Sequence, residues 1–307
     1  MSVPYITCEI ESRLDWRNLI SALQEGHSGP RAQITDSFLY RGSDTLLSRA
    51  SWIDGLGALV KTAMIFPGNT AIGVPSVNGG VSLFSDRDGQ LEAILDFHMV
   101  TKWKTAGDSL LAASKLARPD SRAITLIGAG TVSRSMRDAY QSLFPDAKFT
   151  IWNRSADAAA EFARSSPNST ATEDLEAAVR DADIICTATM STTPVVKGEW
   201  LRPGQHLDLI GAFRPDMREV DDTALTRASL FVDSRDTTID HIGELKDPIS
   251  RGIISVDDVI ADFYDIAQGH FKRPSQDAIT IAKNGGGAHL DLLTSRYIFE
   301  EWEKRPT

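Results

Sequence analysis

Residues 123–133 read AITLIGAGTVS and predict an apolar β-strand that leads into a glycine-rich turn and then a helix. The pyrophosphate of a dinucleotide requires this order, because Gly128 permits the tight turn and Gly130 lets the backbone approach the phosphates. The amino end of the helix, with Thr131 and Val132, presents unpaired N–H groups to the same phosphates. A glycine turn between a core strand and a helix is the alternative interpretation.

The end of the next predicted strand, 148–152, bears on the type of nucleotide. About 20 residues beyond such glycines, an acidic side chain normally binds the ribose hydroxyls of NAD. Here Asn153-Arg154-Ser155 follow the strand, and no carboxylate stands there. A cation and two small polar groups suit a 2′-phosphate, so Asn153 and Arg154 favour NADP(H), with NAD(H) as the alternative. Taken alone, Arg154 would be a solvated surface arginine.

The composition is that of an ordinary globular protein. The chain has 307 residues, of which 42% are hydrophobic and 24% charged, and its formal net charge is -10. This charge argues against nucleic-acid binding, and no apolar run approaches the roughly 20 residues of a membrane helix. Residues 1–5 lack the layout of a signal peptide, and Cys8 and Cys186 lack metal-ligand spacing. We therefore expect a cytoplasmic protein with two buried thiols.

The amino-terminal part predicts a helix followed by a mostly antiparallel sheet. Residues 15–25 place apolar side chains on one helical face after a capping Asp15, and Gly26 would end this helix. Short β-rich runs separated by turn residues come next, and a long helix over 99–116 follows them. The β-rich runs are 37–40, 45–49, 59–66, 80–85 and 91–96.

Strands and helices alternate in the second part of the chain. This alternation predicts right-handed βαβ crossovers and a doubly wound parallel sheet of the Rossmann type. The predicted strands are 123–127, 148–152, 183–187, 206–210 and 229–233. The chain is thus predicted to be an α/β protein with a Rossmann-type nucleotide domain over 119–290. An α+β domain over 1–118 would be completed by a terminal helix, 291–307.

Several separated motifs together resemble the ornithine cyclodeaminase/mu-crystallin family over nearly the whole chain, and their order and spacing make the resemblance specific. The matching motifs are Val60-Lys61, Phe66-Pro67-Gly68-Asn69, Thr101-x-x-Lys104-Thr105-Ala106, Leu116-Ala117-Arg118-Pro119, Gly128-Ala129-Gly130, Trp152-Asn153-Arg154-Ser155, Ile210-Gly211-Ala212-x-Arg214-Pro215-Asp216-Met217-Arg218-Glu219, Val232-Asp233, Gly243-Glu244-Leu245 and Lys283-x-Gly285. The resemblance implies a homodimer whose α+β domain binds substrate and dimerises. It also implies hydride chemistry at the α-carbon of an amino or imino acid.

The resemblance places Lys61 at the centre of this chemistry. A site for an imino acid needs cations for the carboxylate, a proton source for the nitrogen and a nicotinamide above the carbon. In the family, the lysine of this strand contacts the substrate carboxylate and is a proton donor. Without the family, Lys61 would be assigned to the polar face of an alternating strand.

Three further cations are candidates for binding the substrate. Lys104 stands where the family usually has an arginine, which keeps the charge but loses bidentate recognition. Alone, it would be a helix-surface lysine that pairs with Asp108. Arg31 lies roughly where another family arginine reaches the carboxylate, and Arg49 is its competitor, so the sequence leaves this choice open.

Phe213 bears on the direction of the reaction and is a candidate substrate-binding residue. In the family, cyclodeaminases and the related alanine dehydrogenases place an aspartate here to engage the substrate amine, whereas mu-crystallin, a ketimine reductase, lacks it. A phenyl ring neither accepts a proton nor forms a salt bridge with an ammonium group. Phe213 therefore favours reduction of an imine, unless Asp216 or Asp208 takes the role of the aspartate.

Two more segments are expected beside the cofactor. Thr187, Ala188 and Thr189 end a predicted strand at the edge where doubly wound sheets bind ligands. In the family, the segment that contains Gly285 approaches the nicotinamide, although a hinge is an equal interpretation. The histidines lack metal-ligand spacing, and we expect no metal site.

The sequence and the resemblance together predict an NAD(P)H-dependent imino-acid reductase. Hydride would pass to the α-carbon of a cyclic or acyclic ketimine such as Δ1-pyrroline-2-carboxylate, giving the amino acid. The alternatives are an ornithine cyclodeaminase-type lyase with recycled NAD and a non-enzymatic NADP(H)-binding protein like mu-crystallin. No nucleic-acid or membrane partner is expected.

Overall fold

The computed structural model describes residues 3–304, which divide into two compact units. Unit 1 contains the described residues up to Lys104 and those from Gly287 onward, and unit 2 is Thr105–Gly286. The first boundary lies inside the long helix α2, Phe97–Leu116, rather than after residue 118. The second half of α2 belongs to unit 2 because Ser109 Oγ accepts a hydrogen bond from Asn284, 2.6 Å away.

Unit 1 is built on a six-stranded sheet with the order β1-β6-β5-β4-β3-β2 among its described residues. β1 runs parallel to β6, and the other neighbouring strands are antiparallel. The strands are β1 Tyr5–Ile6, β2 Gln33–Arg41, β3 Asp44–Ile53, β4 Gly57–Ile65, β5 Val77–Phe84 and β6 Leu91–Asp96. The predicted β-rich runs thus form the expected sheet, with longer strands at its β2 edge.

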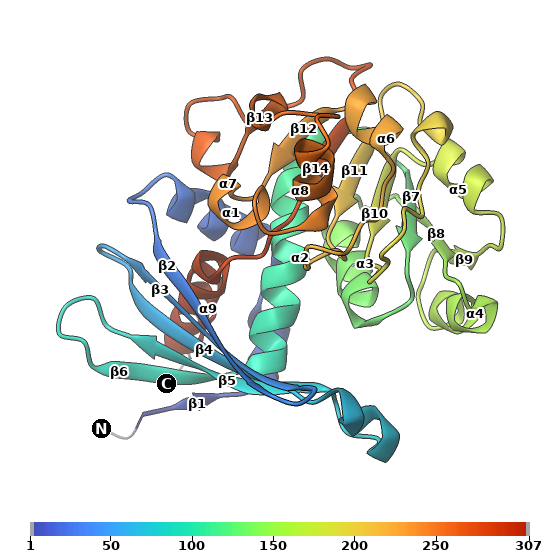
Figure 1. Ribbon diagram of the computed structural model, residues 1–307. Coiled ribbons are helices and arrows are strands. Elements are labelled where there is room, and N and C mark those ends of the chain that lie inside the picture. Colours follow the sequence, from blue (N-terminus) through green and yellow to red (C-terminus); the bar gives the residue numbers. More distant parts are fainter. Residues whose placement is uncertain (1–2, 305–307) are drawn as a thin grey trace. The chain divides into compact units, whose positions relative to one another are not determined.

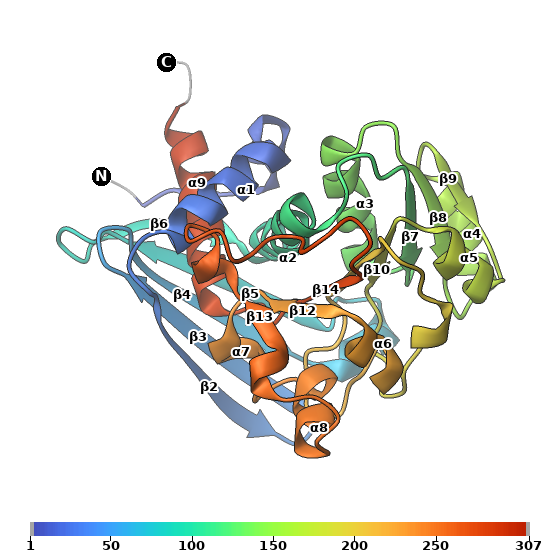
Figure 2. The same ribbon diagram turned by 90° about the horizontal axis from the view of Figure 1, so that it is seen from above.

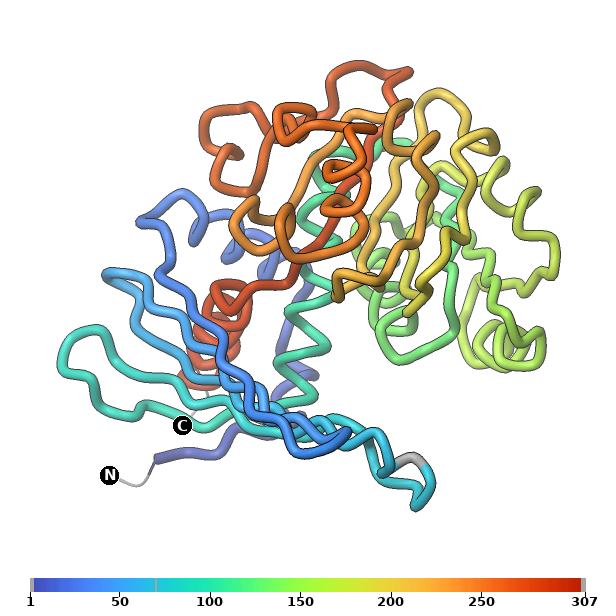
Figure 3. The backbone as a smooth tube through the Cα atoms, in the orientation of Figure 1, coloured from blue at the N-terminus to red at the C-terminus, as the bar shows by residue number. Residues whose placement is uncertain are grey.

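Two helices from opposite ends of the chain pack together in unit 1. α1 (Trp16–His27) contacts α9 (Ala288–Glu303), and α9 contacts β2, β3 and β4 (Figures 1 and 2). The tube in Figure 3 shows the red C-terminal helix beside the blue strands of this sheet. Two short 3-10 helices, Cys8–Arg13 and Pro67–Ile72, complete the unit.

The start of α1 agrees with the sequence prediction, but its end does not. The side chain of Asp15 accepts hydrogen bonds from the backbone N–H groups of Arg17 and Asn18, as an N-cap does. Gly26 lies inside the helix instead of ending it. A Cβ on Gly26 would lie only 2.1 Å from Leu293 Cδ2, so the glycine allows the close approach of α9.

The two faces of the unit 1 sheet differ in burial. On β4, Leu59, Lys61 and Ala63 are buried, whereas Val60 and Met64 are exposed. Side chains alternate between the faces of a strand, so Lys61 lies on the apolar, buried face. The cross-strand register places the exposed Ile94 on the same open face as Val60.

Unit 2 contains a parallel sheet whose described strands have the order β13-β12-β14-β11-β10-β7-β8-β9. The predicted strands appear as β7 Ala123–Ile127, β8 Lys148–Trp152, β10 Ile184–Thr187, β11 His206–Leu209 and β12 Ser229–Val232. The longer helices between strands are α3 Thr131–Leu143, α4 Ala156–Arg164, α5 Leu175–Asp181, α6 Asp222–Arg227 and α8 Gly243–Ser250. The Rossmann-type α/β fold is therefore confirmed (Figure 1).

The sequence did not predict three short strands of this sheet. They are β9 Ser169–Ala171, β13 Val259–Ala261 and β14 Thr280–Lys283. β9 and β13 have three residues each, and β14 has only two apolar residues between Thr280 and Lys283, so none of them shows an apolar run of strand length. Short helical segments fill the rest, namely α7 Arg235–Thr238 and the 3-10 turns Gly198–Trp200, Val256–Asp258 and Phe263–Asp265.

The two cysteines differ in exposure. Cys186 is buried in β10, as predicted, whereas Cys8 is exposed in its short 3-10 helix, contrary to the prediction. Helices long and apolar enough to cross a membrane are absent from residues 3–304.

Candidate active site

A buried ion pair joins the middle of the unit 1 sheet to the C-terminal helix. Lys61 Nζ on β4 donates to Asp291 Oδ1 on α9, 2.8 Å away. The same ammonium donates to Thr101 Oγ1 on α2, also at 2.8 Å, and lies 4.8 Å from the ring centre of Phe97. Asp291 is fully buried and Lys61 is 6% exposed, so the pair is shielded from bulk water.

Two more cations surround this carboxylate. Arg49 lies opposite Lys61 in the β3–β4 register, and its Nη1 is 3.7 Å from Asp291 Oδ2. Arg49 also binds Asp36 on the neighbouring β2, with Nη2 2.7 Å from Oδ2. Lys104 is buried on α2, about one turn after Thr101, and acts electrostatically on both Lys61 and Asp291.

The pKa shifts follow from this arrangement. Burial lowers the pKa of Lys61, Lys104 and Arg49 lower it further, and Asp291 acts in the opposite direction. Burial by itself raises the pKa of Asp291, but the three cations outweigh it and the net shift is downward. Burial, His27 and Lys104 hold the pKa of the neighbouring His289 well below its usual value, so this histidine is neutral.

This cluster gathers cations of the kind that bind a carboxylate. Three of them, Arg49, Lys61 and Lys104, act on the carboxylate of Asp291. A buried charge is costly unless it is paired. Lys61 and Lys104, the two buried lysines of the cluster, are therefore candidates for binding a substrate carboxylate.

The structure brings Lys61, Arg49 and Lys104 together, as expected for substrate-binding residues. Arg31 lies exposed in the segment before β2. Asp291 was missed by the sequence analysis. A usable signal existed, because this aspartate interrupts a run of apolar residues on the terminal helix.

The glycine-rich turn of unit 2 has the geometry of a phosphate-binding loop. Gly128 has φ 114°, a conformation that favours glycine, and a Cβ there would lie 2.8 Å from Ala188 O. Gly130 caps α3, and a Cβ built on it would meet no atom within 4 Å. The first turn of α3, with Thr131 and Val132, leaves amide groups without helical acceptors. These features fit a dinucleotide pyrophosphate.

The residues after β8 are placed at the strand end as predicted. Asn153 Nδ2 donates to Ser155 O, and Ser155 caps α4 by accepting a hydrogen bond from Ala158 N. Arg154 is exposed, and within residues 3–304 it has no ion-pair partner. Its guanidinium is therefore available to a ligand.

The other predicted cofactor residues have internal partners. The hydroxyl of Thr187 is fully buried and donates to Asp208 O, and the hydroxyl of Thr189 donates to Glu219 Oε1 at 2.8 Å. A Cβ on Gly285 would lie 2.3 Å from Thr238 Oγ1. The glycine at 285 is thus explained by close packing within unit 2.

Phe213 is 58% exposed on the loop after β11. Of the two aspartates considered as substitutes for the family aspartate, Asp208 is fully buried, and burial raises its pKa well above the usual value. Asp216 is exposed and forms an ion pair with Arg214 at 2.9 Å. Neither aspartate combines exposure with a free carboxylate.

The chain is similar to known proteins over most of its length. A sequence model of the ornithine cyclodeaminase/mu-crystallin family matches residues 54–305. A Delta(1)-pyrroline-2-carboxylate reductase of Paracoccus denitrificans (strain Pd 1222) is 49% identical over 292 residues, which cover 93% of this chain and 92% of that protein. The ketimine reductase mu-crystallin of Mus musculus is 31% identical over 244 residues, covering 79% and 75%. A solved archaeal alanine dehydrogenase dimer with bound NAD is 28% identical, with a TM-score of 0.89 and coverage of 100% and 98%.

Proposed function

Because this chain belongs to the ornithine cyclodeaminase/mu-crystallin family, we propose that it is an NAD(P)H-dependent imino-acid reductase. Its substrate is a ketimine with one carboxylate, such as Δ1-pyrroline-2-carboxylate, and its product is the amino acid. The observation that carries this proposal is the buried cluster around Asp291, where Lys61, Lys104 and Arg49 lie together and can bind a carboxylate. The 49% identical relative bears the name of a reductase for this same imine.

Three cations bind the substrate carboxylate in the proposed mechanism, and one of them, Lys61, also donates the proton. Lys61, Lys104 and Arg49 hold the substrate carboxylate, and a reduced nicotinamide, when bound, would supply the hydride for the imine carbon. Lys61 Nζ gives a proton to the imine nitrogen and becomes a neutral amine, which then takes a proton from water. The lowered pKa of Lys61 makes this transfer easier than it is for an ordinary lysine.

Phe213 favours reduction over cyclodeamination. A cyclodeaminase in this family uses an aspartate at this position to engage the substrate amine, and the aromatic ring cannot replace it. Asp208 is too buried to take the role, and Asp216 is already paired with Arg214. The proposed reaction therefore needs no carboxylate on this loop.

Replacement of Lys61 tests the proposed function. The wild-type chain should consume NADPH or NADH with Δ1-pyrroline-2-carboxylate, followed by loss of reduced-nicotinamide absorbance. Lys61→Met keeps a long, unbranched side chain but removes the charge and the proton, so kcat/KM should fall about a hundredfold or more. Lys102→Met is the matched control, because Lys102 lies on α2 but pairs with Glu11.

Two outcomes would contradict the proposal. Ammonia release from ornithine without net nucleotide consumption would identify a lyase. Tight nucleotide binding without turnover of a panel of cyclic and acyclic imines would identify a binding protein.

We propose that NADP(H) is preferred over NAD(H). Support comes from Arg154, an exposed guanidinium at the tip of β8, and from the absence of a carboxylate among residues 153–155. A 2′-phosphate would pair with this cation, whereas a 2′-hydroxyl would gain little from it.

Arg154→Ala should raise the KM for NADPH about tenfold and leave the KM for NADH within about twofold. Arg164→Ala, which removes another exposed arginine at the far end of α4, is the control. Equal effects of Arg154→Ala on both nucleotides, or a wild-type preference for NADH, would exclude this proposal.

We also propose that two copies of the chain form a homodimer through the open face of the unit 1 sheet. This face carries exposed apolar side chains, among them Trp52, Val60, Met64 and Ile94. A large exposed apolar patch commonly marks a protein interface. The archaeal alanine dehydrogenase relative is described as a dimer.

Ile94→Lys should convert the dimer to a monomer, because it places a charge in the apolar interface. Ile260→Lys is the matched control, since Ile260 is also exposed (46%, against 39% for Ile94) but belongs to β13 of unit 2. Sedimentation equilibrium measures the outcome. A monomeric wild type, or an Ile94→Lys dimer as stable as the wild type, would refute this interface.

The free thiols of Cys8 and Cys186 are compatible with a reducing compartment, and we propose a cytoplasmic location on that basis. Retention of full activity in a strong thiol reductant is the result expected for a protein without structural disulfides.

A further inference from the structure

We propose that Glu219 is a positioning residue that holds the two loops after β10 and β11 in the arrangement that binds the nucleotide. It closes the motif 214–219, to which the proposed chemistry assigns no other role. The inference rests on the proposed nucleotide site but does not depend on which imine is reduced. Its basis is a set of hydrogen bonds within unit 2.

The carboxylate of Glu219 accepts four hydrogen bonds from two separate loops. Oε1 accepts from the backbone N–H of Thr189 at 2.7 Å and from its hydroxyl at 2.8 Å. Oε2 accepts from the N–H groups of Gly211 at 2.8 Å and Ala212 at 3.2 Å. Glu219 is fully buried. One side chain thus ties together the ends of two neighbouring parallel strands.

The loop after β10 directly contacts the glycine-rich turn. A Cβ on Gly128 would lie 2.8 Å from Ala188 O, the residue before Thr189. β10 pairs with β7, the strand that leads into Gly128. Ligands of doubly wound sheets bind beyond the carboxyl ends of these strands. A shift of Thr189 therefore moves the wall of the nucleotide site.

Gly211 is packed closely against the loop after β10 and against Glu219. A Cβ at this position would lie 2.1 Å from Thr189 O and 2.5 Å from Glu219 Oε1. The two loops and the carboxylate thus leave no space for a side chain. This explains why a glycine begins the loop that carries Phe213.

The residue before Phe213, Ala212, is hydrogen-bonded through both its backbone N–H and its backbone C=O. Ala212 N donates to Glu219, and Ala212 O accepts a hydrogen bond from Lys283 Nζ at 2.7 Å. Lys283 also donates to Leu209 O and Asn284 O. Its ammonium is fully buried, and burial lowers its pKa although Glu219 and other carboxylates oppose this shift. The buried side chains of Glu219 and Lys283 therefore hold the backbone just before the exposed Phe213.

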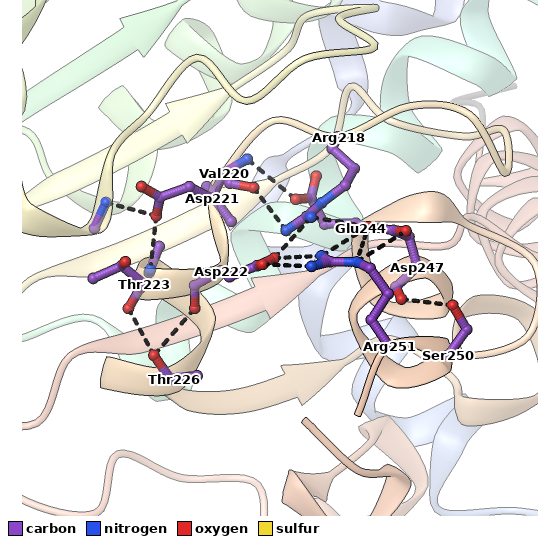
Figure 4. Close-up of polar contacts among 12 residues, drawn as sticks. Arg218, Val220, Asp221, Asp222, Thr223, Thr226, Glu244, Asp247, Ser250 and Arg251 are labelled. Carbon is purple, nitrogen blue, oxygen red and sulfur yellow. Dashed lines mark hydrogen bonds and ion pairs between the residues drawn. The ribbon is translucent and has the colours of Figure 1, made fainter. Parts of the chain in front are cut away.

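A second buried glutamate anchors the backbone of Glu219. Glu244 Oε2 accepts from Glu219 N at 2.7 Å, and Oε1 accepts from Val220 N at 3.1 Å. Figure 4 shows Glu244 beside Val220 and the ion pairs that Arg218 and Arg251 form with Asp222 and Asp247. Burial and Glu219 raise the pKa of Glu244 to about 7. Glu244 contacts the chain at 219–220 and not the two loops, which makes it a matched control.

The test compares Glu219→Gln with Glu244→Gln. In either variant an NH2 group replaces one carboxylate oxygen and cannot accept from the backbone N–H groups that this oxygen bound, so each should lower the unfolding temperature. Only Glu219→Gln releases Thr189, Gly211 or Ala212. We expect the Kd for NADPH, measured by nicotinamide fluorescence, to rise about tenfold in Glu219→Gln and to stay within about threefold of wild type in Glu244→Gln.

The kinetic readout separates positioning from general damage. In Glu219→Gln the KM for the nucleotide should rise while kcat at saturating nucleotide stays within about threefold of wild type. An unchanged Kd in Glu219→Gln would overturn the inference. A loss of affinity in both variants that follows their loss of thermal stability would overturn it too. The Kd measurement needs no imine, so it remains decisive even if the proposed reductase activity is absent.

Discussion

The buried ion pair between Lys61 and Asp291 is the interaction on which the account of unit 1 depends. A lysine on the apolar face of a sheet is unstable without a counter-charge, and an aspartate inside a terminal helix is equally so. Their pairing at 2.8 Å joins α9 to the centre of the sheet and aligns Lys61 toward α2. Arg49 and Lys104 place further positive charge beside the same carboxylate. The same contacts that complete the fold therefore gather the cations that we propose to bind the substrate carboxylate.

In unit 2, buried charged side chains hold the backbone of loops. Lys283 donates to three backbone carbonyls, and Glu219 accepts from three backbone amides and one hydroxyl. Loops at the carboxyl ends of parallel strands have no ladder of their own to hold them. Fully bonded charged side chains give these loops a single arrangement. In both units, ionisable groups inside the protein position the residues that we propose to bind a ligand.

Local patterns in the sequence predicted much of this structure. β7 and β8 were predicted with their observed limits, because an apolar run bounded by turns is a local signal. The position of Lys61 was different, since alternation alone would place it on the polar face of its strand. Only the separated family motifs indicated a functional lysine, and the structure places it on the buried face.

Contacts between residues far apart in the chain could not be predicted from the sequence. Asp291 lies 230 residues after Lys61, and no periodicity links the two. The choice between Arg31 and Arg49 depends on the β3–β4 register, which brings Arg49 opposite Lys61. Gly26 was interpreted as a helix end because its contact with Leu293 could not be known in advance. Gly285 likewise has a packing partner, Thr238, that only the fold supplies.

The pH dependence of Asp291→Asn is the most direct measurement of the role of the buried pair. Lys61 must be protonated to act, so activity falls as the pH rises through its pKa. Asp291 raises that pKa, and its loss should move the alkaline limb of kcat/KM to lower pH by about one unit or more. Asp36→Asn removes a carboxylate that binds Arg49 rather than Lys61, so its limb should move less. An alkaline limb that stays in place in Asp291→Asn, or that moves to higher pH, would contradict the account.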